Sequence, residues 1–259
     1  MSVARNKKAL IDQFPDAHSI RLEGNEDCVL MVHGFTGSPA TLKNLAKEIH
    51  FQLGMSILAP LLPGHGTTPQ DLNQVTWQDW VEEIEEHYGK ALKKYKKVHL
   101  LGLSTGGTIC VEVHKRNPGR ASSICLLSPA YRIRPAILQW LSYLFMMLPN
   151  AILLGSKKKE GIPPLGDVSY SEYPFRSVKQ FLRICRRMLW VRKDEHLPVL
   201  VIASQQDEII DPASADFFYS KFPHPKSKLV KLYRSSHIIT LGSEKKRVFK
   251  EVISFLQAQ

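Results

Sequence analysis

Ser104 stands in the segment Gly102-Leu103-Ser104-Thr105-Gly106, between an apolar run and a segment with helical spacing. A serine at a sharp strand-to-helix turn projects its hydroxyl above the sheet, and glycines two residues away on either side relieve the crowding there. Such a hydroxyl attacks a carbonyl carbon only when a neighbouring base removes its proton. The segment therefore predicts acyl transfer with Ser104 as nucleophile. The alternative is a serine that merely shapes a turn.

A base and an orienting carboxylate both occur downstream. Asp207 comes just after the strand-like residues 199–203, and His237 comes just after the strand-like residues 228–233. Loops that follow parallel strands meet at the edge of the sheet where Ser104 is expected. We predict His237 as the base and Asp207 as the acid that orients it, in the chain order Ser, Asp, His.

Other residues compete for these two roles. The competing bases are His33, His65, His196 and His224, and the competing acids are Glu208 and Asp211. His33 and His65 lie in glycine-rich turns, where we expect them to brace loops. His224 lies between prolines on a surface connection. Asp207 is nearest the strand end, whereas Asp211 precedes a proline and is expected to cap a helix.

Acyl transfer also needs two N–H groups that stabilise the oxyanion formed during the reaction. The first expected donor is the backbone N–H of Thr105, at the start of the helix that follows Ser104. The second is the backbone N–H of Phe35, in His33-Gly34-Phe35-Thr36-Gly37. Glycines on both sides of Phe35 let the backbone fold closely over the nucleophile.

The elements that position these residues alternate between strands and helices. Short apolar runs, rich in Val, Leu and Ile, occupy residues 28–32, 98–103, 122–127 and 199–203. Runs of this kind are typical of strands buried on both faces. Helical stripes lie between them, for example Leu42, Leu45, Ala46 and Ile49. This alternation predicts an α/β fold with a mostly parallel central sheet flanked by helices.

The alternation stops after Ser128 and Pro129 and resumes only at Leu197 and Pro198, roughly sixty residues later. A loop of this length without structure is unusual in a compact domain, so we predict an inserted helical cap over residues 131–192. The core domain then comprises residues 1–130 and 193–259. Two apolar helix faces are expected in the cap: Trp140, Tyr143, Leu144 and Met147, and Val178, Phe181, Leu182, Cys185 and Leu189. A capping box of Ser177 and Gln180 is expected to open the second helix.

Residues 136–155 contain no charged side chain, and their number is close to the roughly 20 residues that span a bilayer. Pro149 and Asn150 interrupt this stretch, which favours paired helices over an apolar cleft, or an interfacial patch. Trp140, Tyr143, Met146 and Met147 are more typical of core than of substrate contacts, but they could line a slot for an acyl chain. With Lys157, Lys158 and Lys159 beside it, the cap is a candidate for transient contact with an anionic membrane or micelle.

The chain of 259 residues has a formal charge of +11, with 35 Lys and Arg against 24 Asp and Glu. The basic residues form separate short clusters without nucleic-acid-binding motifs, so we expect solvated faces and no nucleic-acid partner. Cys28, Cys110, Cys125 and Cys185 are widely spaced, which argues against a zinc site and favours buried, reduced thiols in a cytoplasmic protein. Asp12 and Gln13 interrupt the only apolar run near the N-terminus, so we expect no signal peptide. We expect neither a metal nor an organic cofactor.

The sequence resembles the carboxylesterase and monoacylglycerol lipase group of α/β-hydrolases, especially small bacterial esterases, over nearly its whole length. The matching segments are His33-Gly34-Phe35-Thr36-Gly37, Pro63-Gly64-His65-Gly66, Trp77-Gln78-Asp79-Trp80, Gly102-Leu103-Ser104-Thr105-Gly106-Gly107, Gln206-Asp207-Glu208 and Ser236-His237. The resemblance implies a catalytic triad of Ser104, Asp207 and His237, with Phe35 and Thr105 as oxyanion donors. Two departures are visible: Ser236 replaces the glycine that is frequent before the histidine, and the cap matches only loosely.

The resemblance implies hydrolysis of carboxylic esters with short or medium acyl chains, including monoacylglycerols, through an acyl-enzyme. Thioester hydrolysis is an open alternative, because the same oxyanion chemistry serves either leaving group. A different class of alternative is a non-catalytic binding protein with this fold, which would usually lack part of the triad.

Overall fold

The computed structural model describes residue 12 and residues 17–134, 156–157, 169–170 and 172–259. Within these residues, a seven-stranded sheet with the order β1-β3-β2-β4-β5-β8-β9 forms the centre. Its strands are β1 (Ile20–Leu22), β2 (Asp27–Val32), β3 (Ser56–Ala59), β4 (Lys97–Leu103), β5 (Ser123–Leu127), β8 (Val199–Ser204) and β9 (Lys228–Leu232). β1 is antiparallel to β3, and the other neighbouring strands are parallel. The predicted mostly parallel sheet is confirmed.

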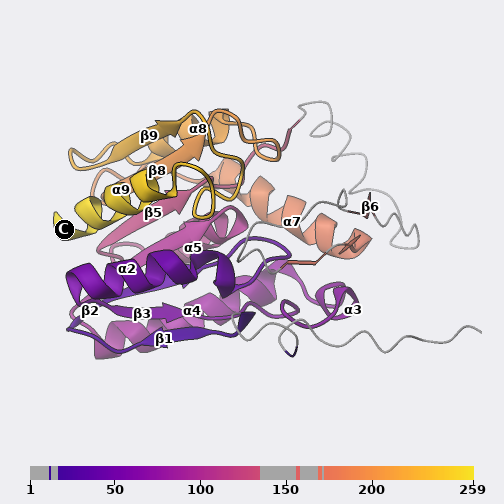
Figure 1. Cartoon of the computed structure of the whole chain (residues 1–259), viewed down its shortest axis with the longest axis horizontal. Helices are drawn as coiled ribbons and strands as arrows, with labels where there is room; N and C mark the ends of the chain where they lie inside the picture. The colour runs from indigo at the N-terminus through magenta and orange to yellow at the C-terminus, as the bar shows by residue number, and fades with distance from the viewer. Residues whose placement is uncertain (1–11, 13–16, 135–155, 158–168, 171) are drawn as a thin grey trace, which may run out of the picture.

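Helices cover both faces of the sheet (Figure 1). α2 (Lys43–Leu53) and α9 (Lys245–Gln257) pack on one face, and α4 (Trp77–Lys94), α5 (Thr105–Arg116) and α8 (Ala213–Lys221) pack on the other. Successive residues of β2 alternate between the two layers: Leu30 contributes to the core beside α4 and α5, and Met31 contributes to the core beside α2. This alternation explains why the strand reads as a continuous apolar run.

Shorter elements connect this framework. They are η2 (Pro39–Leu42), α3 (Pro69–Leu72), a two-stranded ribbon of β6 (Ser156–Lys157) and β7 (Glu172–Tyr173), α7 (Phe175–Arg187) and η3 (Met188–Trp190). α7 packs against α4 and α5. At the α5 contact, the Arg187 guanidinium binds the buried carboxylate of Glu112 at 2.6 Å, which fixes the end of α7 to the helix that follows Ser104.

α7 is the longest element in the described part of the predicted cap. Phe181, Leu182 and Cys185 are buried as expected, whereas Leu189 remains 49% exposed. The predicted capping box is wrong, because the helix begins at Phe175, two residues before Ser177. The Ser177 hydroxyl instead donates to the Pro174 carbonyl at 2.7 Å. Trp140, Tyr143, Leu144, Met146, Met147, Pro149, Asn150, Lys158 and Lys159 lie outside the described residues, as does the side chain of Lys157.

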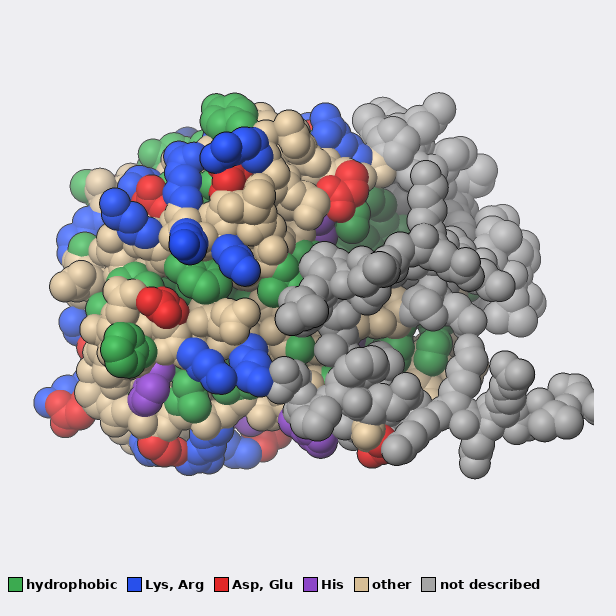
Figure 2. Space-filling model, viewed as in Figure 1, with side chains coloured by type: hydrophobic (Ala, Val, Ile, Leu, Met, Phe, Trp, Pro, Cys, Tyr) green, Lys and Arg blue, Asp and Glu red, His purple; other side chains and the backbone are tan. Residues whose placement is uncertain are grey.

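Lys and Arg are scattered over the face that carries α2 and α9, with acidic side chains among them (Figure 2). The four cysteines are buried and free. In the portion of the chain that the structure describes, no helix combines the length and the apolar character needed to cross a bilayer.

Candidate active site

Ser104 occupies the turn between β4 and α5 with a backbone strain that the sequence pattern predicts. Its φ of 55° and ψ of −119° lie in a region that side-chain-bearing residues rarely adopt. The turn is held from both sides, because the Ser104 N–H donates to the Leu127 carbonyl at 2.8 Å and the Ser104 carbonyl accepts from the Ala130 N–H at 3.2 Å. The serine is thus fixed at the carboxyl edge of the sheet.

Glycines make this turn sterically possible. A Cβ atom at Gly102 would overlap the backbone of Gly106, and a Cβ atom at Gly106 would overlap the carbonyl oxygen of Val32 in β2. Both clashes are with backbone atoms, which cannot rotate away as a side chain could. The spacing of the two glycines around Ser104 is therefore a packing requirement of the turn.

His237 connects the serine to an acid. Its Nε2 atom lies 2.9 Å from Ser104 Oγ, and its Nδ1 atom lies 2.7 Å from Asp207 Oδ2. The carboxylate only accepts, so Nδ1 carries a proton, and Nε2 of the neutral ring can accept the Ser104 hydroxyl proton. All three side chains are buried. The structure brings together the three residues that the sequence predicts as nucleophile, base and orienting acid.

The loop after β8 fixes the Asp207 carboxylate. Its Oδ1 atom accepts from the Ile209 N–H at 2.9 Å and the Ile210 N–H at 2.8 Å, which leaves Oδ2 for His237. An antiparallel bridge between Ile133 and Ile210 attaches this loop to the first residues of the predicted cap. Both carboxylate oxygens are thus engaged and the acid has a single orientation toward the imidazole.

The rival acids have other tasks. Glu208 Oε2 accepts from the backbone N–H of His237 at 3.2 Å, so it supports the loop that carries His237. The imidazole ring of His237 contacts Asp207 instead. Asp211 Oδ1 accepts from the Ala213 N–H at 2.9 Å at the start of α8, close to its predicted capping role. From the sequence, Glu208 is predicted only as a competing acid. Its contact with the His237 N–H depends on a loop conformation that sequence spacing does not reveal.

The predicted oxyanion donors lie on either side of Ser104. Thr105 is the first residue of α5, where backbone N–H groups have no acceptor within the helix. Opposite it, a Cβ atom at Gly34 would lie 3.3 Å from Ser104 Cβ, so the backbone that leads to Phe35 passes directly beside the nucleophile. Thr36 follows with a φ of 62°, a left-handed conformation that turns the chain over the site.

Two buried histidines hold this loop, as predicted. His65 Nε2 accepts from the Thr36 N–H at 3.1 Å, and His33 Nε2 accepts from the Leu62 N–H at 3.0 Å. Burial lowers the pKa of His65 to about 4, and burial together with the neighbouring His65 lowers the pKa of His33 to about 3. Both rings are therefore neutral near pH 7 and act as backbone acceptors.

An apolar wall borders the site. Phe35 stacks on Phe181 of α7 with ring centroids 5.3 Å apart and planes at 16°. Phe181 belongs to a buried cluster with Ala130, Leu182, Cys185 and Ile210. Ala130 binds the Ser104 backbone and Ile210 binds Asp207, so this cluster directly adjoins the Ser104–His237–Asp207 arrangement. Tyr170, which the sequence does not single out, donates from its hydroxyl to the Gly64 carbonyl at 2.8 Å.

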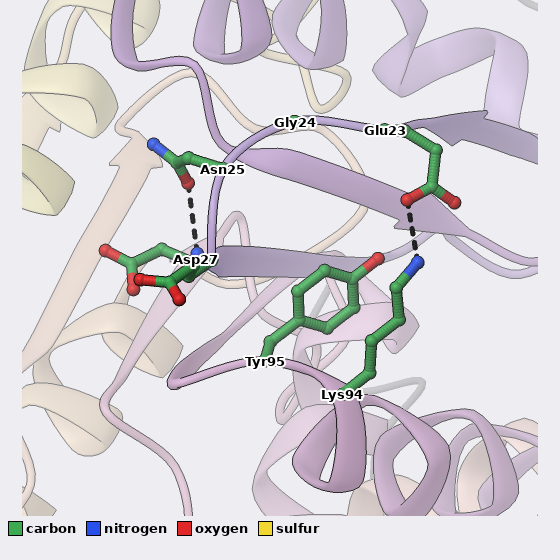
Figure 3. Close-up of a pocket in the computed structure, with 7 residues that line it drawn as sticks. Glu23, Gly24, Asn25, Asp27, Lys94 and Tyr95 are labelled. Atoms are coloured by element: carbon green, nitrogen blue, oxygen red, sulfur yellow. Dashed lines mark hydrogen bonds and ion pairs between the residues drawn. The ribbon is translucent and has the colours of Figure 1, made fainter.

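A separate hollow lies at the amino edge of the sheet (Figure 3). It has a volume of about 470 Å³ and is lined by Glu23, Gly24, Asn25, Glu26, Asp27, Lys94 and Tyr95. Asp27 begins β2, whereas Ser104 follows the carboxyl end of the neighbouring β4. The hollow is therefore at the opposite edge from the triad, and its Lys94–Glu23 pair at 2.7 Å lies between half-exposed side chains.

The sheet order, the strained serine turn and the Ser104–His237–Asp207 geometry together define the α/β-hydrolase class. The model of the family described as serine aminopeptidase, S33, matches residues 24–163, just over half of the chain. The chain belongs to this family, and its predicted resemblance to α/β-hydrolases is confirmed.

Curated relatives align over nearly the full chain. A thermostable monoacylglycerol lipase of Bacillus sp. (strain H-257) is 28% identical, and the alignment covers 94% of this chain and 97% of that protein. A carboxylesterase of Bacillus subtilis (strain 168) is 25% identical over 91% of this chain and 94% of that protein. A solved structure from work on the metagenome-derived lipolytic enzymes LipS and LipT superposes with a TM-score of 0.82 and 26% identity, covering 95% of this chain and 99% of that chain.

Proposed function

We propose that this protein hydrolyses carboxylic esters, with Ser104 as nucleophile, His237 as general base and acid, and Asp207 as the residue that orients His237. The single observation that carries the proposal is the continuous set of contacts from Ser104 Oγ to His237 Nε2 at 2.9 Å and from His237 Nδ1 to Asp207 at 2.7 Å. The backbone N–H groups of Phe35 and Thr105 are the proposed oxyanion donors.

The reaction has two steps. Ser104 Oγ attacks the ester carbonyl carbon as its proton passes to His237 Nε2, and the resulting oxyanion is stabilised by the Phe35 and Thr105 N–H groups. His237 then gives this proton to the departing alcohol oxygen, leaving an acyl group on Ser104. Water, deprotonated by His237, attacks the acyl-enzyme and releases the carboxylic acid. Asp207 keeps the proton of the neutral ring on Nδ1 and stabilises the imidazolium.

The proposed substrates are esters with short or medium acyl chains, including monoacylglycerols. The apolar cluster of Phe35, Phe181, Leu182 and Ile210 beside the triad supports an acyl site. The names of the Bacillus relatives, a monoacylglycerol lipase and a carboxylesterase, point in the same direction. Thioesters share the carbonyl chemistry of the same triad and are the competing substrate class.

Initial rates on p-nitrophenyl esters and monoacylglycerols of increasing chain length test this proposal, with a thioester series of matched acyl groups alongside. We expect turnover of esters that exceeds turnover of the matched thioesters, and loss of at least about 10³-fold in kcat in Ser104→Ala. A folded wild type without turnover on either series would contradict the proposal. Turnover confined to thioesters would overturn the ester assignment while leaving the triad intact.

Membrane contact through the cap is a further part of the proposal. The charge-free residues 136–155 and the adjacent basic Lys157, Lys158 and Lys159 support attraction to anionic lipid surfaces. Co-sedimentation with vesicles at low salt provides the test. We expect stronger binding to anionic than to neutral vesicles, whereas equal binding to both would contradict this contact.

The buried free thiols support a cytoplasmic location, where reducing conditions maintain cysteines as thiols. Fractionation of cells that produce the protein is the direct check. Recovery of the full-length protein outside the cytoplasmic fraction would contradict this location.

A further inference from the structure

The hydroxyl of Ser204 joins the loop that carries Asp207 to the loop that carries His237. Ser204 is the last residue of β8 and is fully buried. Its Oγ atom donates to the Ser235 carbonyl and accepts from the Gln206 N–H at 3.1 Å. Ser235 lies two residues before His237, and Gln206 lies one residue before Asp207. One buried hydroxyl thus contacts both loops next to the residues that form the Asp207–His237 pair.

Glu244, which precedes α9, also holds the segment of residues 233–237 that carries His237. Its Oε2 atom accepts from the N–H groups of Tyr233 at 3.1 Å and Arg234 at 2.8 Å, and from the Ser235 hydroxyl at 3.1 Å. In return, Ser235 Oγ accepts from the Glu244 N–H at 3.3 Å. The carboxylate therefore binds three successive residues of the segment that leads to His237.

The electrostatics of Glu244 agree with this arrangement. Burial alone would raise its pKa, but hydrogen bonds from the Arg234 N–H, the Ser235 hydroxyl and the Tyr233 N–H outweigh burial and lower it. The side chain is consequently an ionised acceptor at neutral pH. Removal of Ser204 would take the donor from the buried Ser235 carbonyl, and removal of Glu244 would take the acceptor from the buried Ser235 hydroxyl and from the part-buried N–H groups of Tyr233 and Arg234. Loss of these hydrogen bonds favours movement of the loop.

We propose that Ser204 and Glu244 are positioning residues that hold the segment of residues 233–237 in the place where His237 reaches both Asp207 and Ser104. Neither side chain touches the reacting atoms, and each acts through Ser235. This inference rests on the proposed function, because it assigns the two residues to the base of that triad. A misplacement of about 1 Å at a catalytic group can lower a rate by roughly 100-fold, so small loop movements are sufficient for a measurable effect.

The test compares Ser204→Ala, Glu244→Ala and the conservative variants Ser204→Thr and Glu244→Gln. Glu251→Gln is the matched control, because Glu251 lies on α9 and pairs with Lys228 at 2.6 Å on the surface. We expect kcat on p-nitrophenyl butyrate to fall by roughly 10- to 100-fold in both alanine variants, with KM changed by less than about two-fold. The conservative variants should recover most of this loss, and Glu251→Gln should match the wild type.

A second readout follows the position of His237 without turnover. A proton shared between His237 Nδ1 and Asp207 gives a far-downfield ¹H NMR signal, which Asp207→Asn should abolish. We expect this signal to be lost or broadened in Ser204→Ala and Glu244→Ala while circular dichroism shows a folded protein. If Ser204→Ala does not fold, Glu244→Ala at the outer end of the network carries the test.

Folded alanine variants that retain the wild-type kcat and the downfield signal would overturn the inference. A loss confined to KM would also contradict it, because such a loss indicates weaker substrate binding. The NMR readout separates this outcome from failure of the proposed function: a wild type that does not turn over esters contradicts the function, whereas the signal in the variants still tests the positioning of His237.

Discussion

The Nε2 atom of His237 lies 2.9 Å from the Oγ atom of Ser104, although 133 residues separate them in the chain. Parallel strands account for this contact, because β4 and β9 belong to the same sheet and the loops that follow them meet at one edge. Asp207 follows β8, the strand between them nearest to β9, and completes the arrangement. The chemistry therefore depends on loops at three strand ends.

Asp207→Asn should lower kcat by roughly 10³- to 10⁴-fold, because an amide no longer selects the His237 tautomer with its proton on Nδ1. Asp211→Asn is the matched control, since its retained Oδ1 atom can still accept from the Ala213 N–H. Steady-state kinetics on a p-nitrophenyl ester provide the measurement. Equal kcat losses in the two variants would contradict the assignment of Asp207 as the orienting acid.

Gly106→Ala should lower the free energy of unfolding by roughly 3 kcal/mol, because the added Cβ overlaps the Val32 carbonyl oxygen. Gly89→Ala should have the opposite effect, a gain of about 1 kcal/mol, because Gly89 lies within α4 and a Cβ there meets no atom within 4 Å. Urea denaturation of both variants tests the pair. A Gly106→Ala protein as stable as the wild type would show that the serine turn is less crowded than the structure indicates.

Much of the fold and the triad could be predicted from sequence, for a physical reason. Strands buried on both faces require apolar residues throughout, so residues 28–32 and 98–103 are distinctive, and the polar residues that follow such strands must lie at one edge. The sequence does not predict β3, because its four residues, Ser56–Ala59, are too few to show a pattern.

The rest of the site could not be predicted in the same way. The Ser204 hydroxyl binds the backbone carbonyl of Ser235, 31 residues further along the chain. The sequence does not distinguish a serine that makes such a contact from any other serine nearby. Ser177 and Gln180 match a capping pattern that predicts the start of α7 wrongly, because the Gln180 side chain instead accepts from the Trp77 N–H at 3.4 Å. Contacts between loops depend on backbone conformations that composition and spacing do not specify.

Stability should fall as the pH is lowered from about 6.5 toward 4. Burial lowers the pKa of His65 and His99 to about 4, and burial with the neighbouring His65 lowers that of His33 to about 3. An unfolded chain takes up protons at these rings near pH 6.5, whereas the folded chain does not, so protonation favours unfolding. Protonation of each ring in the unfolded chain should lower the free energy of unfolding by about 2 kcal/mol between pH 7 and pH 5.

Urea denaturation at pH 7, 6 and 5 measures this dependence. His99→Gln is the informative variant, because His99 lies in β4 and binds the Ser123 hydroxyl, away from the triad. Its loss of stability between pH 7 and pH 5 should be smaller than that of the wild type by the contribution of one ring. Equal losses in the two proteins would show that His99 is not a neutral buried group.

The four cysteines should be inert in the folded protein. Burial raises the pKa of Cys28 to about 12 and also raises the pKa of Cys110, Cys125 and Cys185, so few thiolates form at pH 8 and reagents cannot reach them. Titration with Ellman's reagent should detect no rapid thiol in the native state and four thiols in guanidinium chloride. Rapid native reaction of any of them would contradict the buried placement.

The identity of the nucleophile can be tested directly by intact mass measurement after treatment with a fluorophosphonate, which reacts with an activated serine. We predict one adduct on the wild type, located by peptide mapping at Ser104, and none on Ser104→Ala. A folded wild type that gains no adduct, or one that carries the adduct on another residue, would contradict the proposed role of Ser104.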